Sequence, residues 1–271
     1  KTYDCDFTDC YDAASNSGSA IHCGSSLVRI VDCTFVGNGS PVVGAQNGGS
    51  GTEFKNCMFD GNDGTVFRLD HNNVHMTISN CVIRCMSATG YAIYVQPWSS
   101  GNSPQYVTVL NSRIIGPVAG CGDYYNCLIS GCNTKDTPAV SCSEKAAWHT
   151  DPAHPLSLYN CTVRGNETET SAAAASDWVY AYNTLFVNNT SKAQVADRLK
   201  EALSCRLDDS TVVEGDATGT IHADPLLMDD ANGLPHPSES SPCRAGGDLQ
   251  YVATETDLAG NPRTSAKDGV T

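Results

Sequence analysis

The amino-acid sequence predicts an all-β protein that folds as a single-stranded, right-handed parallel β-helix with three short strands per coil. Three observations predict this solenoid. An Asx-Cys motif recurs about every 25 residues, apolar residues alternate on both sides of it, and a glycine-rich segment separates the copies. Self-similarity at such a period is typical of proteins whose repeats stack into one continuous core.

The repeated motif is Asx, then Cys or another small residue, then any residue, then a large apolar residue. Successive copies are 24, 24, 31, 15, 34 and 23 residues apart, and an earlier copy begins at Asp4. The 15-residue step is too short for a full coil and predicts either an irregular segment between Ser112 and Cys127 or a slip in the alignment of the motif there. The motif begins at Asp32, Asn56, Asn80, Asn111, Asn126, Asn160 and Asn183.

The residues around each Asx predict two strands that meet at a corner. Val28 and Ile30 stand four and two residues before Asp32, which is the alternation of a strand. Cys33 and Phe35 share the opposite parity, so both point inward on the following strand. Asn and Asp suit such a corner because they tolerate the left-handed region. Stacked coils would then place these side chains in an asparagine ladder, with amide hydrogen bonds along the axis.

A third strand completes each predicted coil. The segments 18–23, 64–70 and 90–96 each begin with glycine and then alternate apolar and polar residues. If Phe67 and Leu69 point into the core, Arg68 and Asp70 point outward.

The segments that interrupt the rhythm predict the domain organisation. The long spacings between motif copies predict lateral loops at 96–105 and 143–155. Within 191–204, Ser191 and Gln194 form a capping box, and Val195, Leu199, Ala202 and Leu203 share one helical face. We therefore expect one domain over 1–271, with repeats over about 1–190, a lateral α-helix inserted at 191–205, and a closing segment at 206–271.

The charge of the chain excludes some partners. A formal net charge of -14 argues against binding to nucleic acid or to an anionic membrane surface, and 17% charged residues is too few for a disordered polyelectrolyte. No apolar run approaches the ~18 residues of a membrane span. No signal peptide is visible at "KTYDCDF", so we expect that a leader was removed or that the chain is a piece of a longer protein.

The fourteen cysteines lack the spacing of a zinc site or a CxxC redox pair. One interpretation is that they are small apolar core residues. The other is that they form disulfides in an exported protein, because strands of adjacent coils lie about 4.8 Å apart, within the Cα separation of a disulfide. The first pairs expected are Cys57 with Cys81 and Cys127 with Cys161, and further candidates are Cys205 and Cys243.

The end of the sequence resembles a known family. "DPLLMDDANGLPHPSESSPCRAGGD" and "TDLAGNPR", over about 223–263, look like the closing segment of bacterial right-handed β-helix proteins of the choice-of-anchor surface class. That family usually continues to a final acidic-aromatic strand, and because the sequence stops at "KDGVT" we expect this strand to be absent or not included. The repeats resemble those of pectate-lyase-like proteins. The resemblance implies a secreted or surface-attached bacterial protein whose relatives include polysaccharide lyases and glycoside hydrolases.

In pectate-lyase-like enzymes the cleft follows the strand that matches the third strand here. The resemblance therefore implies a polar surface on which Arg68, Asp70 and His71 are the candidates for acid-base work. A solvated solenoid surface with no function is the alternative interpretation. The candidate ligand-binding residues are His22, Tyr94, Gln96, Trp98, Trp148 and His149.

The sequence leaves the activity open between two classes. The first is a non-catalytic extracellular module for structure, adhesion or carbohydrate binding. The second is a polysaccharide lyase or glycoside hydrolase, against which the low Lys and Arg count and the lack of a placed carboxylate pair both argue. No cofactor is expected. The metal content stays open: "WHTDPAHP" has no recognised ligand spacing, and calcium is the metal that acidic loops would favour. Polysaccharides, surface proteins and assembly through the solenoid ends are the expected partners.

Overall fold

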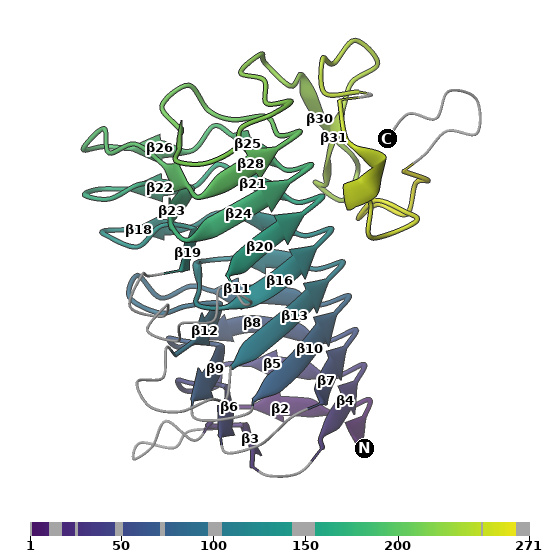
Figure 1. Cartoon of the computed structure of the whole chain (residues 1–271). Helices are drawn as coiled ribbons and strands as arrows, with labels where there is room; N and C mark the ends of the chain where they lie inside the picture. Colours follow the sequence, from purple (N-terminus) through teal and green to yellow (C-terminus); the bar gives the residue numbers. More distant parts are fainter. Residues whose placement is uncertain are drawn as a thin grey trace.

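The computed structural model is a stack of coils in which each coil contributes a strand to each of three parallel sheets (Figure 1). It describes residues 2–10, 18–24, 27–46, 51–70, 74–96, 105–142, 155–244 and 246–263. Among the described residues, every strand pair is parallel except that of β30 and β31. The fold is the predicted right-handed parallel β-helix.

Each of the three sheets takes every third strand of the chain in the lower coils and every fourth strand in the upper coils, which contain additional short strands. Sheet A contains β1 (Thr2–Tyr3), β4 (Arg29–Val31), β7 (Thr52–Lys55), β10 (His75–Ser79), β13 (Tyr106–Leu110), β16 (Gly122–Tyr125), β20 (Leu156–Tyr159), β24 (Val179–Tyr182) and β28 (Glu201–Leu203). Sheet B contains β2 (Asp6–Thr8), β5 (Thr34–Val36), β8 (Met58–Asn62), β11 (Val82–Cys85), β14 (Arg113–Ile115), β17 (Leu128–Ser130), β21 (Thr162–Arg164) and β25 (Leu185–Val187). Sheet C contains β3 (Ile21–Cys23), β6 (Val43–Gln46), β9 (Phe67–Asp70), β12 (Ile93–Val95), β15 (Val118–Ala119), β19 (Val140–Cys142) and β23 (Ala175–Asp177).

Shorter strands complete the upper coils and the closing segment. A small sheet contains β18 (Asn133–Thr134), β22 (Glu167–Thr168) and β26 (Thr190–Ser191). β27 (Arg198–Leu199) pairs with β29 (Val212–Val213), and β30 (Leu227–Asp229) forms an antiparallel hairpin with β31 (Pro235–Pro237). The one helical element among the described residues is a short 3-10 turn, η2 (Leu249–Tyr251).

The corner between sheets A and B has the geometry that the motif predicts. All seven predicted Asx residues have positive φ, from 48° at Asn111 to 56° at Asp32. Cys57 and Phe59 point inward and are buried, as the parity argument predicts. We call these seven Asx residues the outer ladder. Its side chains bond along the axis where Asn56 Nδ2 donates to Asp32 Oδ1 (2.8 Å) and Asn80 Nδ2 to Asn56 Oδ1 (3.2 Å).

A second ladder, which the sequence analysis missed, lies at the far end of sheet B. Asn38 Nδ2 donates to Asn62 Oδ1 (3.1 Å), and Asn166 Nδ2 to Asn189 Oδ1 (2.8 Å). Asn38, Asn62 and Asn166 are buried. We call these four residues the inner ladder. Its sequence signal is the left-handed residue that precedes each inward asparagine, as in "VGN", "DGN", "RGN" and "VNN".

The predicted irregularity between Ser112 and Cys127 is wrong, because these 15 residues form a complete coil. β14, β15 and β16 follow one another and pair in register with the coils below and above. Two glycines make the coil this tight. Gly120 has φ +96°, and a Cβ there would lie 2.1 Å from the carbonyl oxygen of Val95. Gly116 has φ +122° and packs against Cys85.

The predicted α-helix at 191–204 is also wrong, and the repeats do not stop near 190. Leu199 and Ala202 are buried in another coil, in which β28 pairs with β24. Ser204, with φ 52°, takes the corner position and Cys205 the inward one. The backbone then continues through parallel bridges from Leu185 to Arg206 and from Arg206 to Ile221. Tertiary pairing with an existing sheet edge outweighs the helical spacing here.

The predicted disulfides are wrong. All fourteen cysteines are free, including Cys57, Cys81, Cys127, Cys161, Cys205 and Cys243. The Cys57 amide donates to Cys81 Sγ (3.4 Å), and the Cys127 amide does the same to Cys161 Sγ (3.4 Å). In-register parallel strands keep their Cα–Cβ bonds side by side, so the Cβ atoms stay about 4.8 Å apart. A disulfide needs about 3.8 Å between them.

Candidate functional site

The predicted polar surface on sheet C is formed in register. His22, Gly44, Arg68 and Tyr94 occupy equivalent positions on β3, β6, β9 and β12. Phe67, Leu69, Ile93 and Val95 are buried, so the inward parity of this strand is confirmed. Figure 1 shows these four strands at the lower end of the molecule, and Arg68 lies where β9 meets β12.

Arg68 organises a compact polar cluster on this surface. Its Nε donates to Asp70 Oδ2 (2.7 Å), and its Nη2 donates to Gln96 Oε1 (2.9 Å). Its Cζ lies 5.7 Å from the centroid of the Tyr94 ring, which places the guanidinium over the aromatic face. The Arg68 side chain is 27% exposed. Four of the predicted site residues, Arg68, Asp70, Tyr94 and Gln96, therefore meet at one point.

Asp70 departs from its predicted orientation. The sequence analysis expected an outward carboxylate, but only 5% of the side chain is exposed. Its Oδ1 is buried without a hydrogen-bond partner, while Oδ2 accepts from Arg68. The Arg68 pair compensates the buried charge, and the second oxygen remains available to a donor.

Tyr94 and Tyr91 give the cluster an aromatic side. Their ring centroids are 4.9 Å apart. Burial, together with the neighbouring Tyr91, raises the pKa of Tyr94, so its hydroxyl stays protonated at neutral pH and can donate a hydrogen bond. An aromatic face beside polar donors and acceptors is the arrangement that binds a sugar ring.

The other predicted ligand-binding residues are only partly placed. His22 lies on the same surface, two rungs below Arg68 in sheet C. His71, Trp98, Trp148 and His149 lie outside the described residues. In the described part of the chain, no group of three or more His, Cys, Asp or Glu side chains could hold a metal ion, so calcium binding stays a prediction. None of the helical structure described is long and apolar enough to cross a membrane.

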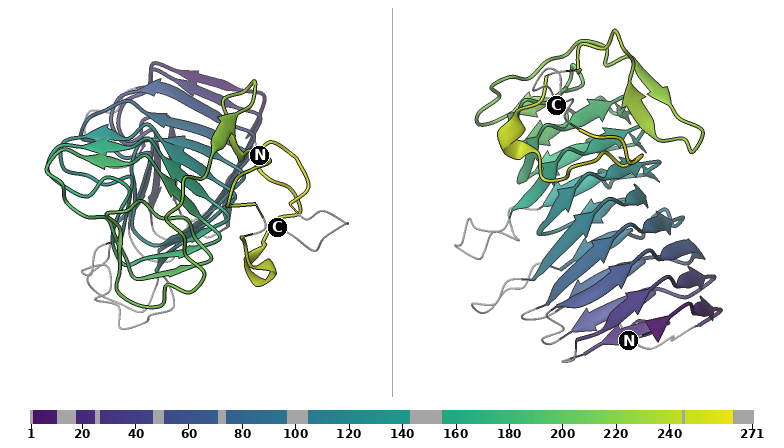
Figure 2. Two further views of the ribbon diagram at one scale, coloured as in Figure 1. Left: turned by 90° about the horizontal axis from the view of Figure 1, so that it is seen from above. Right: turned by 90° about the vertical axis from the view of Figure 1, so that its right-hand side faces the viewer.

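A second candidate site lies between the upper coils and the closing segment, which we define as residues 223–263. This segment lies beside the stack in Figure 2 and binds the outer ladder directly. Asn183 Nδ2 donates to the Asp248 carbonyl (2.8 Å), and the Asp248 amide donates to Asn183 Oδ1 (2.7 Å). The Ala253 amide donates to Asn160 Oδ1 (3.3 Å). The closing segment thus uses the corner amides of the upper coils as its docking groups.

Other contacts hold the two ends of the closing segment. Tyr251 stacks on Tyr182 with 4.7 Å between ring centroids and continues an external stack of Tyr125, Tyr159 and Tyr182. The hairpin β30–β31 is held by an ion pair from Arg164 to Asp229 (2.6 Å). Because the segment is attached at both ends, it forms the roof of a cavity rather than packing flat.

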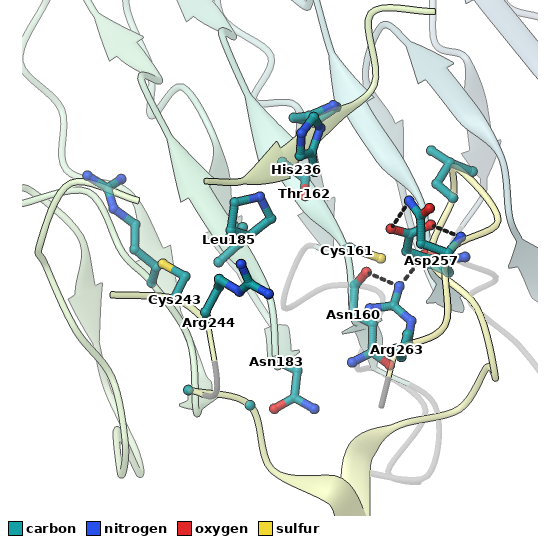
Figure 3. A pocket seen from close by; sticks show the side chains of 18 of the residues that line it. Asn160, Cys161, Thr162, Asn183, Leu185, His236, Cys243, Arg244, Asp257 and Arg263 are labelled. Atoms are coloured by element: carbon teal, nitrogen blue, oxygen red, sulfur yellow. Dashed lines mark hydrogen bonds between the residues drawn. The ribbon is translucent and has the colours of Figure 1, made fainter. Parts of the chain in front are cut away.

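The cavity has a volume of about 890 Å³. Its floor is the outer ladder corner and the first outward residues of sheet B, and its roof is the closing segment (Figure 3). Figure 3 shows Arg263 beside Asn160. Arg263 also donates to Asn126 Oδ1 and to Thr254 Oγ1 (3.0 Å). Polar and charged lining residues are Asn126, Asn160, Thr162, Asn183, Ser204, Arg206, His236, Glu239, Arg244, Asp257, Asn261 and Arg263.

The sequence analysis did not anticipate this cavity. "TDLAGNPR" was singled out for its resemblance, but periodicity gives no signal that Arg263 reaches back to a corner 137 residues earlier. Burial raises the pKa of the Cys205 thiol on the floor to about 12, which makes this thiol a poor nucleophile at neutral pH.

Comparison with known proteins supports the fold but identifies no function. A family model described as a right-handed β-helix region matches residues 1–126, which is less than half of the chain. Neither the curated proteins nor the solved structures give a match. The parallel sheets and this family match together place the chain, as a fold, among the right-handed β-helices.

Proposed function

We propose that the protein is an extracellular or cell-surface carbohydrate-binding module whose sugar site is the Arg68 cluster on sheet C. The observation that carries the proposal is the Arg68 guanidinium, fixed by Asp70 and Gln96 against the Tyr94 ring. A pre-organised planar donor beside an aromatic face binds sugar hydroxyls without a large ordering cost. Asp70 neutralises Arg68, so the cluster suits a neutral sugar better than an acidic one.

A surface location is supported by the resemblance of the closing segment to that of anchored β-helix proteins. The cysteines no longer support export, because they are free thiols. Structural and adhesive roles belong to the same proposal, since adhesion through a glycan would use the same cluster.

The side chain beside Asp70 on the neighbouring coil favours binding over catalysis. The residue at its level on the next coil is Gln96, whose side chain is an amide rather than a second carboxylate. Glycoside hydrolases use two carboxyl groups about 5–10 Å apart. The enzyme alternative would have to use Asp70 Oδ1 as its single buried acid or base.

A glycan array followed by calorimetry with the best neutral oligosaccharide tests this proposal. Arg68→Ala should weaken binding at least about 10-fold, as expected for the loss of a charged hydrogen-bonding group. Arg84→Ala is the matched control, because Arg84 forms a similar pair with Asp60 (3.1 Å) on sheet B. Equal binding by wild type and Arg68→Ala would contradict the proposal. Release of reducing ends or unsaturated products that is lost in Asp70→Asn would establish the enzyme instead.

A further inference from the structure

No side-chain hydrogen bond of the outer ladder joins Asn126 to Asn160, which lie under the closing segment. Below this point, Asn126 Nδ2 donates to Asn111 Oδ1 (2.7 Å), which continues the ladder upward. At the next coil, Arg263 donates to Asn126 Oδ1, which is the acceptor that Asn160 Nδ2 would otherwise use. Asn160 Oδ1 still accepts from the Ala253 amide, but its Nδ2 has no acceptor among the described residues. Asn160 lines the cavity, so a free amide donor borders it.

Two arginines on the cavity wall lack a carboxylate partner. Six of the nine arginines form ion pairs with Asp or Glu, but Arg244 and Arg263 make none with the described residues. Arg263 is held instead by the neutral oxygens of Asn126, Asn160 and Thr254. Arg244 is exposed at the cavity mouth.

The other polar and charged side chains that line the cavity do not offset this excess of hydrogen-bond donors. Asp257 lies near Arg263, but its carboxylate accepts from the Asn261 amide (2.8 Å) and from Asn261 Nδ2 (3.1 Å). Glu239 is exposed at the rim. Arg206 is already paired with Asp208 (2.5 Å). His236 adds another ring nitrogen that can donate.

We propose that the cavity between the outer ladder and the closing segment binds a small organic anion, whose carboxylate or phosphate oxygens are held by Arg244, Arg263 and Asn160 Nδ2. An oxyanion supplies the negative charge that neither guanidinium has as a partner, together with an acceptor for Asn160 Nδ2, and guanidinium groups bind carboxylate and phosphate with matched geometry. Leu185 and Met228 provide apolar wall for a carbon skeleton. The volume lies within the range of small-molecule sites, about 300–1,000 Å³.

Burial supports the same ligand class. Burial lowers the pKa of the Arg263 guanidinium, which shows that its charge is poorly solvated. A bound anion would relieve that cost, whereas a cation or a neutral ligand without acceptors would not. This site is separate from the Arg68 cluster and does not depend on the proposed sugar binding.

Calorimetry on the full chain at low salt tests the proposal with three probes. Succinate and inorganic phosphate distinguish the carboxylate from the phosphate source, and succinamide is the uncharged analogue of succinate. We expect one of the two anions to bind, with succinamide at least 10-fold weaker. Binding should weaken as salt is added, because the attraction is between charges. Lack of binding by both anions, or equal binding of succinate and succinamide, overturns the proposal.

Two variants assign the binding to the cavity. Arg244→Gln removes a cation that makes no described structural contact, and it should weaken anion binding at least about 10-fold without changing the thermal midpoint. Arg198→Gln makes the same charge change at an exposed ion pair with Glu214 (2.6 Å), outside the cavity lining, and should leave binding unchanged. Equal weakening by both variants would show that only the overall charge matters and would overturn the site. Arg68→Ala should not affect anion binding, which separates this test from that of the sugar site.

Discussion

The lower and upper coils of the solenoid use the same corner motif in two different ways. In the lower coils Asp32, Asn56 and Asn80 are exposed and bond to one another along the axis. In the upper coils Asn126 and Asn160 are buried, and their side chains bond to the closing segment. The corner that sets the backbone turn is therefore also a docking surface, wherever another segment of the chain reaches it.

The aromatic residues differ between the same two regions. In the lower coils Phe7, Phe35 and Phe59 stack inside the core, with ring centroids 4.6 and 4.5 Å apart. In the upper coils Tyr125, Tyr159 and Tyr182 stack on the outer face of sheet A. The first stack fills the core, and the second ends on Tyr251 and so attaches the closing segment. The stacked rings therefore stabilise the core in the lower coils and attach the closing segment in the upper coils.

The largest expected difference between the lower and upper coils is in how much each aromatic stack contributes to the free energy of unfolding. Phe59→Ala should lower the free energy of unfolding by about 3–5 kcal/mol, because it leaves a cavity in the core. Tyr159→Ala removes two ring pairs worth about 0.5–1.5 kcal/mol each at the surface and should cost about 1–3 kcal/mol. Urea denaturation measures both. Equal losses would mean that the outer stack is as important to the fold as the inner one.

The second largest expected difference is in stability, between an outer-ladder residue that bonds to its neighbours in the ladder and one that also bonds to the closing segment. Asn56 and Asn126 have nearly the same φ, 54° and 55°, so alanine costs each site a similar ~1–2 kcal/mol of left-handed strain. Asn126→Ala also removes partners of Asn111, Thr256 and Arg263 in a buried setting. We expect a total loss of about 3–4 kcal/mol for Asn126→Ala, against about 1–2 kcal/mol for Asn56→Ala. The comparison fails if the two variants have the same urea midpoint.

The smallest effect is a pH dependence at the hairpin β30–β31. Arg164 holds the pKa of Asp229 below its usual value, so the pair stabilises the docked hairpin above the ordinary Asp pKa and is lost as the pH falls. The Asp229 side chain is 48% exposed, which limits the effect to about 1 kcal/mol or less.

Hydrogen exchange of residues 227–237 measures this effect. Asp229→Asn should speed exchange at pH 7, and the difference from wild type should shrink as the pH falls through the lowered pKa of Asp229. Asp60→Asn removes an exposed pair in the lower coils, where it attaches no segment, and should leave exchange at 227–237 unchanged. Identical exchange in wild type and Asp229→Asn at pH 7 would show that the hairpin is held by other contacts.

Local features of the fold could be predicted because their causes are local. The left-handed corners follow from Asn and Asp, and the inward orientation of Cys57, Phe59, Phe67 and Leu69 follows from the two-residue period of a strand. The Arg68 surface was found by the same parity. The prediction of a helix at 191–204 was wrong because these residues pair with the open edge of a sheet, although their own spacing suits a helix.

The sequence by itself determined the coil, its corners and which side chains face the core, because each depends on backbone preferences and periodicity within a few residues. Only the tertiary structure decided how Asp70 is buried, why stacked cysteines stay unpaired, and where the closing segment docks. These depend on the separation and direction of groups brought together across coils, as when Arg263 meets Asn126, and no local pattern encodes such a meeting.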